Sequence, residues 1–100
     1  MIRVFITYSV PPEKVAENEA AIKKFIDAVK AANDPGFSYS CYKMPDGNSF
    51  THVGWFADQA AKQRFQEPAW FGEFAKGLQS RVSQPPQVTP VTLIASSEVP

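Results

Sequence analysis

The sequence predicts an α+β fold in which strands and helices follow the order β-α-β-β-α-β. Three observations predict it: an apolar opening strand, a long segment with helical periodicity, and two strand-like segments around the turn Pro45-Asp46-Gly47-Asn48. Asp, Gly and Asn accept the backbone angles of tight loops, so this turn connects two antiparallel strands. The order is that of ferredoxin-like domains, in which both helices cover one face of an antiparallel four-stranded sheet.

The first strand and the first helix have clear limits. Residues Ile2 to Val10 are β-branched and aromatic, and Pro11-Pro12 ends the strand. Pro12 or Glu13 opens the helix, because proline is tolerated in a first helical turn. Asn33-Asp34-Pro35-Gly36 ends it. The apolar stripe of this helix is Val15, Ile22, Phe25, Ile26, Val29 and Ala32, with Asn18 and Glu19 filling the intervening step.

The second and third strands are predicted over Phe37 to Met44 and over Ser49 to Phe56. Side chains of a strand alternate between its two faces. In the third strand, one face therefore carries Phe50, His52, Gly54 and Phe56, and the other carries Thr51, Val53 and Trp55.

The second helical region begins after Asp58, a suitable N-cap residue. Its apolar positions are Ala61, Phe65, Trp70, Phe71, Phe74 and Leu78. Pro68 interrupts it, so we expect a kink or two helical pieces meeting near Glu67-Pro68, with Pro68 in the first turn of the second piece. Arg64 and Arg81 are expected on solvated helix faces.

The end of the chain is predicted to hold the fourth strand. Gln84 to Pro90 is rich in proline and is interpreted as a connector. Val91 to Ser96 is predicted to be the strand, and Ser97 to Pro100 a frayed tail.

Composition limits the classes of function. One hundred residues predict a single domain over 1–100, and ten basic residues balance ten acidic ones. Nucleic acid is not an expected partner, because phosphate binding needs clustered positive charge. With no long apolar run and no signal-peptide pattern, we expect no membrane partner and a cytoplasmic protein. Cys41 is the sole cysteine, so we expect no intrachain disulfide and no metal site, and we interpret it as a small apolar strand residue.

His52 is the only histidine, and the unperturbed pKa of histidine lies near neutrality. Any histidine-based acid–base chemistry therefore passes through this residue, with Gly54 beside it leaving room for a ligand or for backbone to approach. The alternative is a hydrogen-bonded structural histidine. Trp70, Phe71 and Phe74 are likewise either core residues or the lining of a cavity.

The strands carry apolar residues on both faces. Ile2, Val4, Ile6 and Tyr8 share one face of the first strand, whereas Phe5 lies on the other. Helices on one side of the sheet leave the second face apolar and uncovered. We therefore expect a second copy of the chain to pack there.

The chain resembles the antibiotic-biosynthesis-monooxygenase-like family of dimeric α/β barrels over about Ile2 to Ala95. The segments that carry the resemblance are Val10-Pro11-Pro12, Pro35-Gly36-Phe37, Phe50 to Phe56, Asp58-Gln59-Ala60-Ala61 and Pro68-Ala69-Trp70-Phe71 followed by Phe74 and Leu78. The resemblance implies a homodimer formed by two sheets packed face to face. Members of the family include cofactor-free oxygenases of polycyclic phenols and haem-degrading enzymes.

The haem-degrading branch typically uses an Asn on the first strand, a Trp early in the second helix and a His later in it. Here Thr7 and Phe65 stand near the first two positions, and Trp70 to Leu78 contains no histidine. These departures disfavour haem degradation. The resemblance instead favours a monooxygenase without metal, flavin or other cofactor, acting on a small aromatic or quinol-type molecule.

The candidate catalytic residue under this reading is His52, as the proton acceptor. The candidate substrate-binding residues are Tyr8, Tyr39, Trp55, Trp70 and Phe74. Two alternatives stay open: a non-catalytic homodimer that binds a small molecule, and a cofactor-free isomerase or lyase that uses His52 as a proton shuttle.

Overall fold

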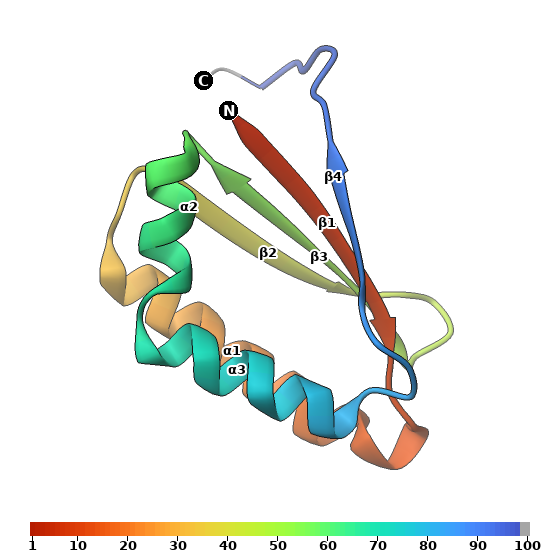
Figure 1. The fold of residues 1–100 in the computed structure, drawn as a ribbon. Coiled ribbons are helices and arrows are strands. Elements are labelled where there is room, and N and C mark those ends of the chain that lie inside the picture. Colours follow the sequence, from red (N-terminus) through yellow and green to blue (C-terminus); the bar gives the residue numbers. More distant parts are fainter. Residues whose placement is uncertain (99–100) are drawn as a thin grey trace.

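A four-stranded sheet with all its helices on one side makes up the fold (Figure 1). The structure is a computed structural model that describes residues 1–98. Its elements are β1 (Ile2–Ser9), the short 3-10 helix η1 (Pro12–Lys14), α1 (Val15–Ala32), β2 (Phe37–Lys43), β3 (Ser49–Phe56), α2 (Gln59–Gln66), α3 (Ala69–Arg81) and β4 (Gln87–Val91). The predicted α+β, ferredoxin-like class is confirmed.

The strands lie in the order β2-β3-β1-β4, and every neighbouring pair is antiparallel. The register pairs His52 of β3 with Ile6 of β1 and with Cys41 of β2. Paired residues of an antiparallel sheet point to the same face, so Tyr8 and Tyr39 stand diagonally across from His52 on the side of the helices.

The predicted turn and cap are present. Asp46 accepts hydrogen bonds from the backbone N–H groups of Asn48 (3.0 Å) and Ser49 (2.8 Å), and Gly47 adopts φ +84°, which glycine accepts without strain. Asp58 caps α2 by accepting a hydrogen bond from the N–H of Ala61 at 2.8 Å.

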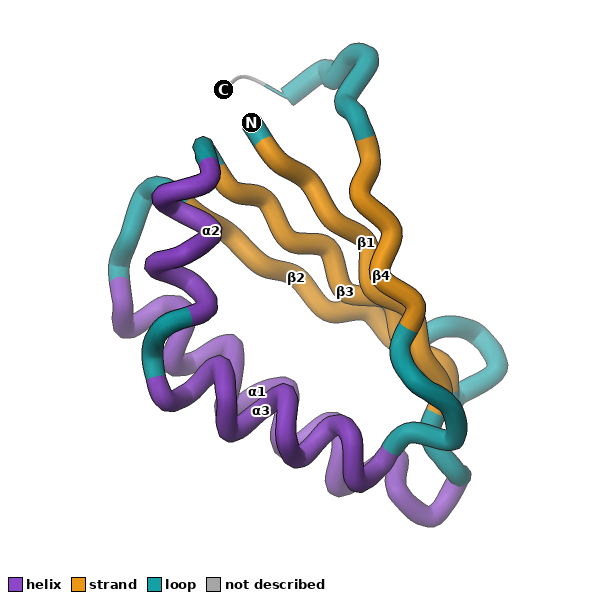
Figure 2. The backbone as a smooth tube through the Cα atoms, viewed as in Figure 1, coloured by secondary structure: helices purple, strands orange, loops and turns teal. Residues whose placement is uncertain are grey.

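The predicted break near Glu67-Pro68 separates α2 from α3. Pro68 differs slightly from the expectation, since it is the N-cap of α3 with extended backbone (ψ 152°) and does not lie inside the first turn. The break lets α3 run beside α1 beneath the sheet, as Figure 2 shows.

The prediction for the last strand is wrong. β4 is Gln87–Val91, which falls largely within the segment interpreted as a connector. Pro90 caused the error, because proline cannot donate a ladder hydrogen bond and argues against a central strand. β4 is an edge strand that pairs only with β1, and an edge tolerates proline.

The core between sheet and helices is strongly aromatic. Phe25 of α1 stacks on Phe74 of α3 with ring centroids 4.5 Å apart, and Phe65 of α2 packs edge-on against Phe37 and Phe56. Such aromatic pairs contribute about 0.5–1.5 kcal/mol each beyond their buried area. Trp70, Phe71 and Phe74 are half-buried against this core.

The sheet face away from the helices is also partly apolar, as predicted. Phe5 pairs with Val53 in register, and Trp55 pairs with Arg3. Phe5 is 40% exposed, while Val53 and Trp55 are half-buried. We call Arg3, Phe5, Val53 and Trp55 the open-face patch.

Candidate active site

His52 lies in the interior with both ring nitrogens hydrogen-bonded. Only 1% of the residue is exposed. Its Nε2 shares a hydrogen bond with the Tyr8 hydroxyl at 2.8 Å, and its Nδ1 shares one with the Tyr39 hydroxyl at 3.1 Å. A neutral imidazole has one N–H and one bare nitrogen, so one tyrosine donates to the ring and the other accepts from it.

The hydrogen bonds continue beyond Tyr8. The amide Nδ2 of Asn18 donates to the Tyr8 hydroxyl at 2.9 Å, and Nε of Arg81 donates to Oδ1 of Asn18 at 2.9 Å. Five side chains therefore form one line from α3 through α1, β1 and β3 to β2. We call Arg81, Asn18, Tyr8, His52 and Tyr39 the buried polar chain.

Local sheet geometry explains the position of Tyr39. This residue pairs with Gly54 in register, and a Cβ atom on Gly54 would lie 3.2 Å from the Tyr39 ring and 3.1 Å from the Phe56 ring. The space that we expected Gly54 to leave for a ligand is filled by these two rings. Glycine thus lets the Tyr39 ring lie close over the sheet.

Burial sets the protonation states in this chain. It lowers the pKa of His52 to about 4, so the imidazole is neutral near pH 7. It raises the pKa of Tyr8 to about 12, although the hydrogen bond from Asn18 partly opposes the shift. Burial also raises the pKa of Tyr39. The Tyr–His–Tyr segment is therefore uncharged, and its hydrogen bonds join each ring nitrogen of His52 to a hydroxyl that can exchange a proton with it.

Asn18 and Arg81 were not identified as site residues from the sequence. Asn18 is fully buried, and Arg81 is only 6% exposed, so the prediction of a solvated face for Arg81 is wrong. Arg81 continues the spacing of Phe74 and Leu78 along α3, which places it on the packed side of the helix. This spacing could have identified Arg81 as a buried residue from the sequence. Arg64, in contrast, is exposed and bonds Asp34.

The predicted substrate-binding residues are only partly brought together. Tyr8 and Tyr39 bond His52, and the Phe74 ring centroid lies 5.8 Å from that of His52. Trp70 packs against Phe25, one layer farther out. Trp55 lies on the opposite face of the sheet and does not join this group.

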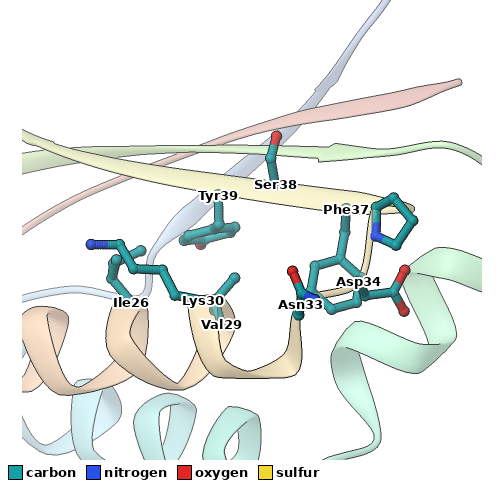
Figure 3. A pocket seen from close by; sticks show the side chains of 9 residues that line it. Ile26, Val29, Lys30, Asn33, Asp34, Phe37, Ser38 and Tyr39 are labelled. Atoms are coloured by element: carbon teal, nitrogen blue, oxygen red, sulfur yellow. The ribbon is translucent and has the colours of Figure 1, made fainter.

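Tyr39 also reaches the surface. It lines a groove of about 630 Å³ between the end of α1 and β2, together with Ile26, Val29, Lys30 and Phe37. Figure 3 shows the Tyr39 ring pointing from β2 toward α1, whereas Ser38 points to the other side of the strand. A neighbouring cleft of about 330 Å³ contains Tyr39 and Cys41. His52 itself lines neither space.

Within residues 1–98, no three His, Cys, Asp or Glu side chains gather into a group that could hold a metal ion. No helix in that range is both long and apolar enough to cross a membrane. Burial raises the pKa of Cys41 to about 12, so its thiol stays protonated and packs as a small apolar group.

Solved structures with the same fold are numerous, and their sequences differ strongly from this one. A structure described as antibiotic biosynthesis monooxygenase has a TM-score of 0.82 at 14% identity, over 95% of this chain and 100% of that chain. Rv0793 from Mycobacterium tuberculosis has a TM-score of 0.84 at 15% identity, over 97% and 98%. SnoaB, described as a cofactor-independent oxygenase from Streptomyces nogalater, has a TM-score of 0.73 at 20% identity, over 96% and 95%.

Among curated protein sequences, none matches this chain. The sequence model described as antibiotic biosynthesis monooxygenase matches residues 1–77, which include β1 to α2, most of α3 and four members of the buried polar chain. Because the match spans well over half of the sequence, the protein belongs to the antibiotic biosynthesis monooxygenase family.

Proposed function

We propose that the protein is a cofactor-free oxygenase that acts on a small aromatic or quinol-type molecule bound in the groove beside Tyr39. The observation that carries the proposal is the pair of tyrosine hydroxyls on the two ring nitrogens of His52. Family membership and the fold shared with SnoaB, described as a cofactor-independent oxygenase, support it. Tyr39 joins the two parts, since it belongs both to the groove and to the buried polar chain.

The proton step begins at Tyr39. A substrate hydroxyl or acidic C–H gives its proton to the Tyr39 oxygen as the Tyr39 proton moves to Nδ1 of His52. The low pKa of His52 keeps this imidazolium short-lived. The proton returns through Tyr39 to the peroxide oxygen formed in the next step, so His52 and Tyr39 act as a relay that takes the proton from the substrate and gives it back.

The oxygen step uses the electrons of the substrate. For an anthrone-like substrate, the electron-rich anion transfers electrons to dioxygen, and a carbon–oxygen bond forms to give a peroxide. The O–O bond then breaks, one oxygen stays as the new quinone carbonyl, and the other leaves as water with the two hydrogens of the oxidised carbon. The protein supplies an apolar wall and the proton relay.

We also propose that the protein is a cytoplasmic homodimer joined through the open-face patch. The half-buried apolar side chains of this patch support the assembly, because helices cover only the other face. A stable interface of this kind buries roughly 2,000 Å² or more in total. A single cysteine that forms no disulfide supports the location.

An oxygen electrode tests the reaction. The purified protein should consume oxygen with at least one member of a panel of anthrone-like and quinol substrates, above the rate without protein. Tyr39→Phe keeps the ring and removes the hydroxyl, so it should lower the rate at least 10-fold. Tyr42→Phe makes the same change at an exposed position on the other face of β2, and this matched control should retain the rate. Full activity of Tyr39→Phe would refute the relay.

A second candidate is a homodimer that binds the same class of molecule without turning it over. It is favoured by the burial of His52, which lines neither of the two spaces at Tyr39. A ligand that binds the groove without oxygen uptake would support this candidate. A product of unchanged oxidation state would instead indicate the isomerase or lyase.

A further inference from the structure

Arg81 is a buried cation without an acidic partner. It is 6% exposed and forms no salt bridge within residues 1–98. Its Nε donates a hydrogen bond to Asn18, and its Nη2 is buried without a hydrogen-bond partner among residues 1–98. A buried charge is costly unless an opposite charge or several hydrogen bonds compensate it. An anion bound beside this guanidinium would compensate its charge.

Arg81 lines a cleft of about 170 Å³ between α1 and α3. Phe25, Trp70 and Phe74 form its aromatic walls, and the Arg81 guanidinium carbon lies 5.8 Å from the Phe74 ring centroid. An apolar cavity of roughly 150 Å³ is enough to hold benzene. The cleft therefore suits a single aromatic ring.

The remaining lining residues are small or exposed. Ala21 and Ala28 lie on the α1 side, and Lys24 and Glu73 are exposed charged residues at the rim. Lys24 attracts an anion and Glu73 repels it. Because both are exposed, water screens their charges. The buried guanidinium therefore dominates the electrostatic potential in the cleft and favours a ligand of negative charge.

Gly77 makes room for the guanidinium. A Cβ atom at this position would lie 2.8 Å from Nη1 of Arg81. Glycine weakens a helix interior, yet here it allows the charged group to fold over α3. Gly72, on the same helix, has nothing within 4 Å of its ideal Cβ position. Of these two glycines, only Gly77 has Arg81 against its Cβ position.

We propose that the cleft between α1 and α3 binds a small aromatic anion whose carboxylate or phenolate oxygen pairs with Arg81. The ring of the ligand lies in the cleft, against the sides of Phe25, Trp70 and Phe74 that line it. The site is separate from the groove at Tyr39, and its occupation does not depend on the oxygenase reaction. It also explains why an arginine stands at the end of an otherwise uncharged polar chain.

Binding of benzoate tests the proposal. In a Trp55→Phe background, Trp70 is the only tryptophan and lines the cleft, so its fluorescence reports occupation. Benzoate should give a saturable signal and raise the thermal midpoint, whereas neutral benzyl alcohol should bind at least 10-fold more weakly. Equal binding of the two compounds, or no binding of benzoate, would overturn the proposal.

Variants locate the site. Arg81→Gln should weaken benzoate at least 10-fold and leave benzyl alcohol unchanged, and Ala28→Leu should exclude both by filling the cleft. If Arg81→Gln does not fold, Gly77→Ala decides, because the added methyl group displaces the guanidinium. It should weaken benzoate binding, while Gly72→Ala should match the parent protein. Unchanged benzoate binding in Gly77→Ala and Ala28→Leu would refute the site.

Discussion

The two faces of the sheet differ in the burial of their apolar side chains and in the hydrogen bonding of their polar side chains. On the helix-covered face, His52 is almost fully buried and both of its nitrogens are bonded. On the other face, Phe5 is exposed, Trp55 is half-buried, and Nε of Arg3 is buried with no hydrogen-bond partner in the described part of the chain, residues 1–98. The covered face buries its histidine with both nitrogens bonded, whereas the open face leaves apolar side chains exposed or half-buried.

The two proposals place different roles on the two faces of one sheet. Alternation along β3 puts His52 on the face proposed for chemistry and Val53 on the face proposed for assembly. A change on the covered face should affect chemistry and folding. A change on the open face should affect assembly.

His52→Ala should lower oxygen uptake by ~10²–10⁴-fold, because Tyr39 then has no ring nitrogen to take its proton. Thermal unfolding measured in parallel controls for folding. A purely structural histidine would instead cost about 1–3 kcal/mol of stability from unpaired hydroxyls, with activity following the folded fraction. Full activity of the variant with an accepted substrate would end the case for His52.

Phe5→Lys should dissociate the dimer, with at least ~100-fold weaker association, because each interface would bury two added charges. Light scattering at micromolar concentration should then report the mass of one chain, against that of two for the parent protein. Gln63→Lys, which adds the same charge at an exposed position of α2 on the helix side of the sheet, is the control. A monomeric parent protein would contradict the proposed assembly.

Acid should destabilise the covered face. In the unfolded chain His52 becomes protonated below about pH 6.5, whereas in the folded protein its pKa is about 4. Stability from this group is complete above pH 6.5 and is lost as the pH falls to 4, with a total of about 3 kcal/mol. In the variant His52→Phe, the thermal midpoint should depend less on pH between 4 and 6.5 than in the parent protein. The pKa values of Asp34 and Asp46 are lowered and so lie beneath this window.

The smallest predicted effect compares two glycines of α3. Gly72→Ala should stabilise the protein by up to about 1 kcal/mol, since its Cβ meets nothing and alanine favours helix. Gly77→Ala should gain less or lose stability, because its methyl group meets Arg81. Urea midpoints with an unchanged slope would measure the difference. Equal gains would show that Arg81 moves freely.

Local patterns predict most of the fold here. Alternation in β3, the Asp46 turn, the Asp58 cap and the interruption at Pro68 are short-range features, and each is found in the structure. β4 was misplaced because a proline in an edge strand and a proline in a loop have the same local sequence. Only the position of β4 beside β1 distinguishes them.

The candidate site was less predictable for the same reason. His52 could be identified as the only histidine, but its partners come from β1 and β2, far away in sequence. The downward shift of its pKa depends on packing by the helices, which spacing does not reveal. Asn18 and Arg81 look like ordinary polar helix residues until α1 and α3 are placed side by side.

Pro90 also bears on aggregation. An edge strand normally presents backbone donors to which a strand from another molecule can add. Pro90 has no N–H group, and it stands near the end of β4, opposite Val4. This interruption hinders extension of the sheet by a further strand at that edge. Pro90→Val supplies the missing backbone N–H group. It should therefore make the protein more prone to fibrous self-association at high concentration.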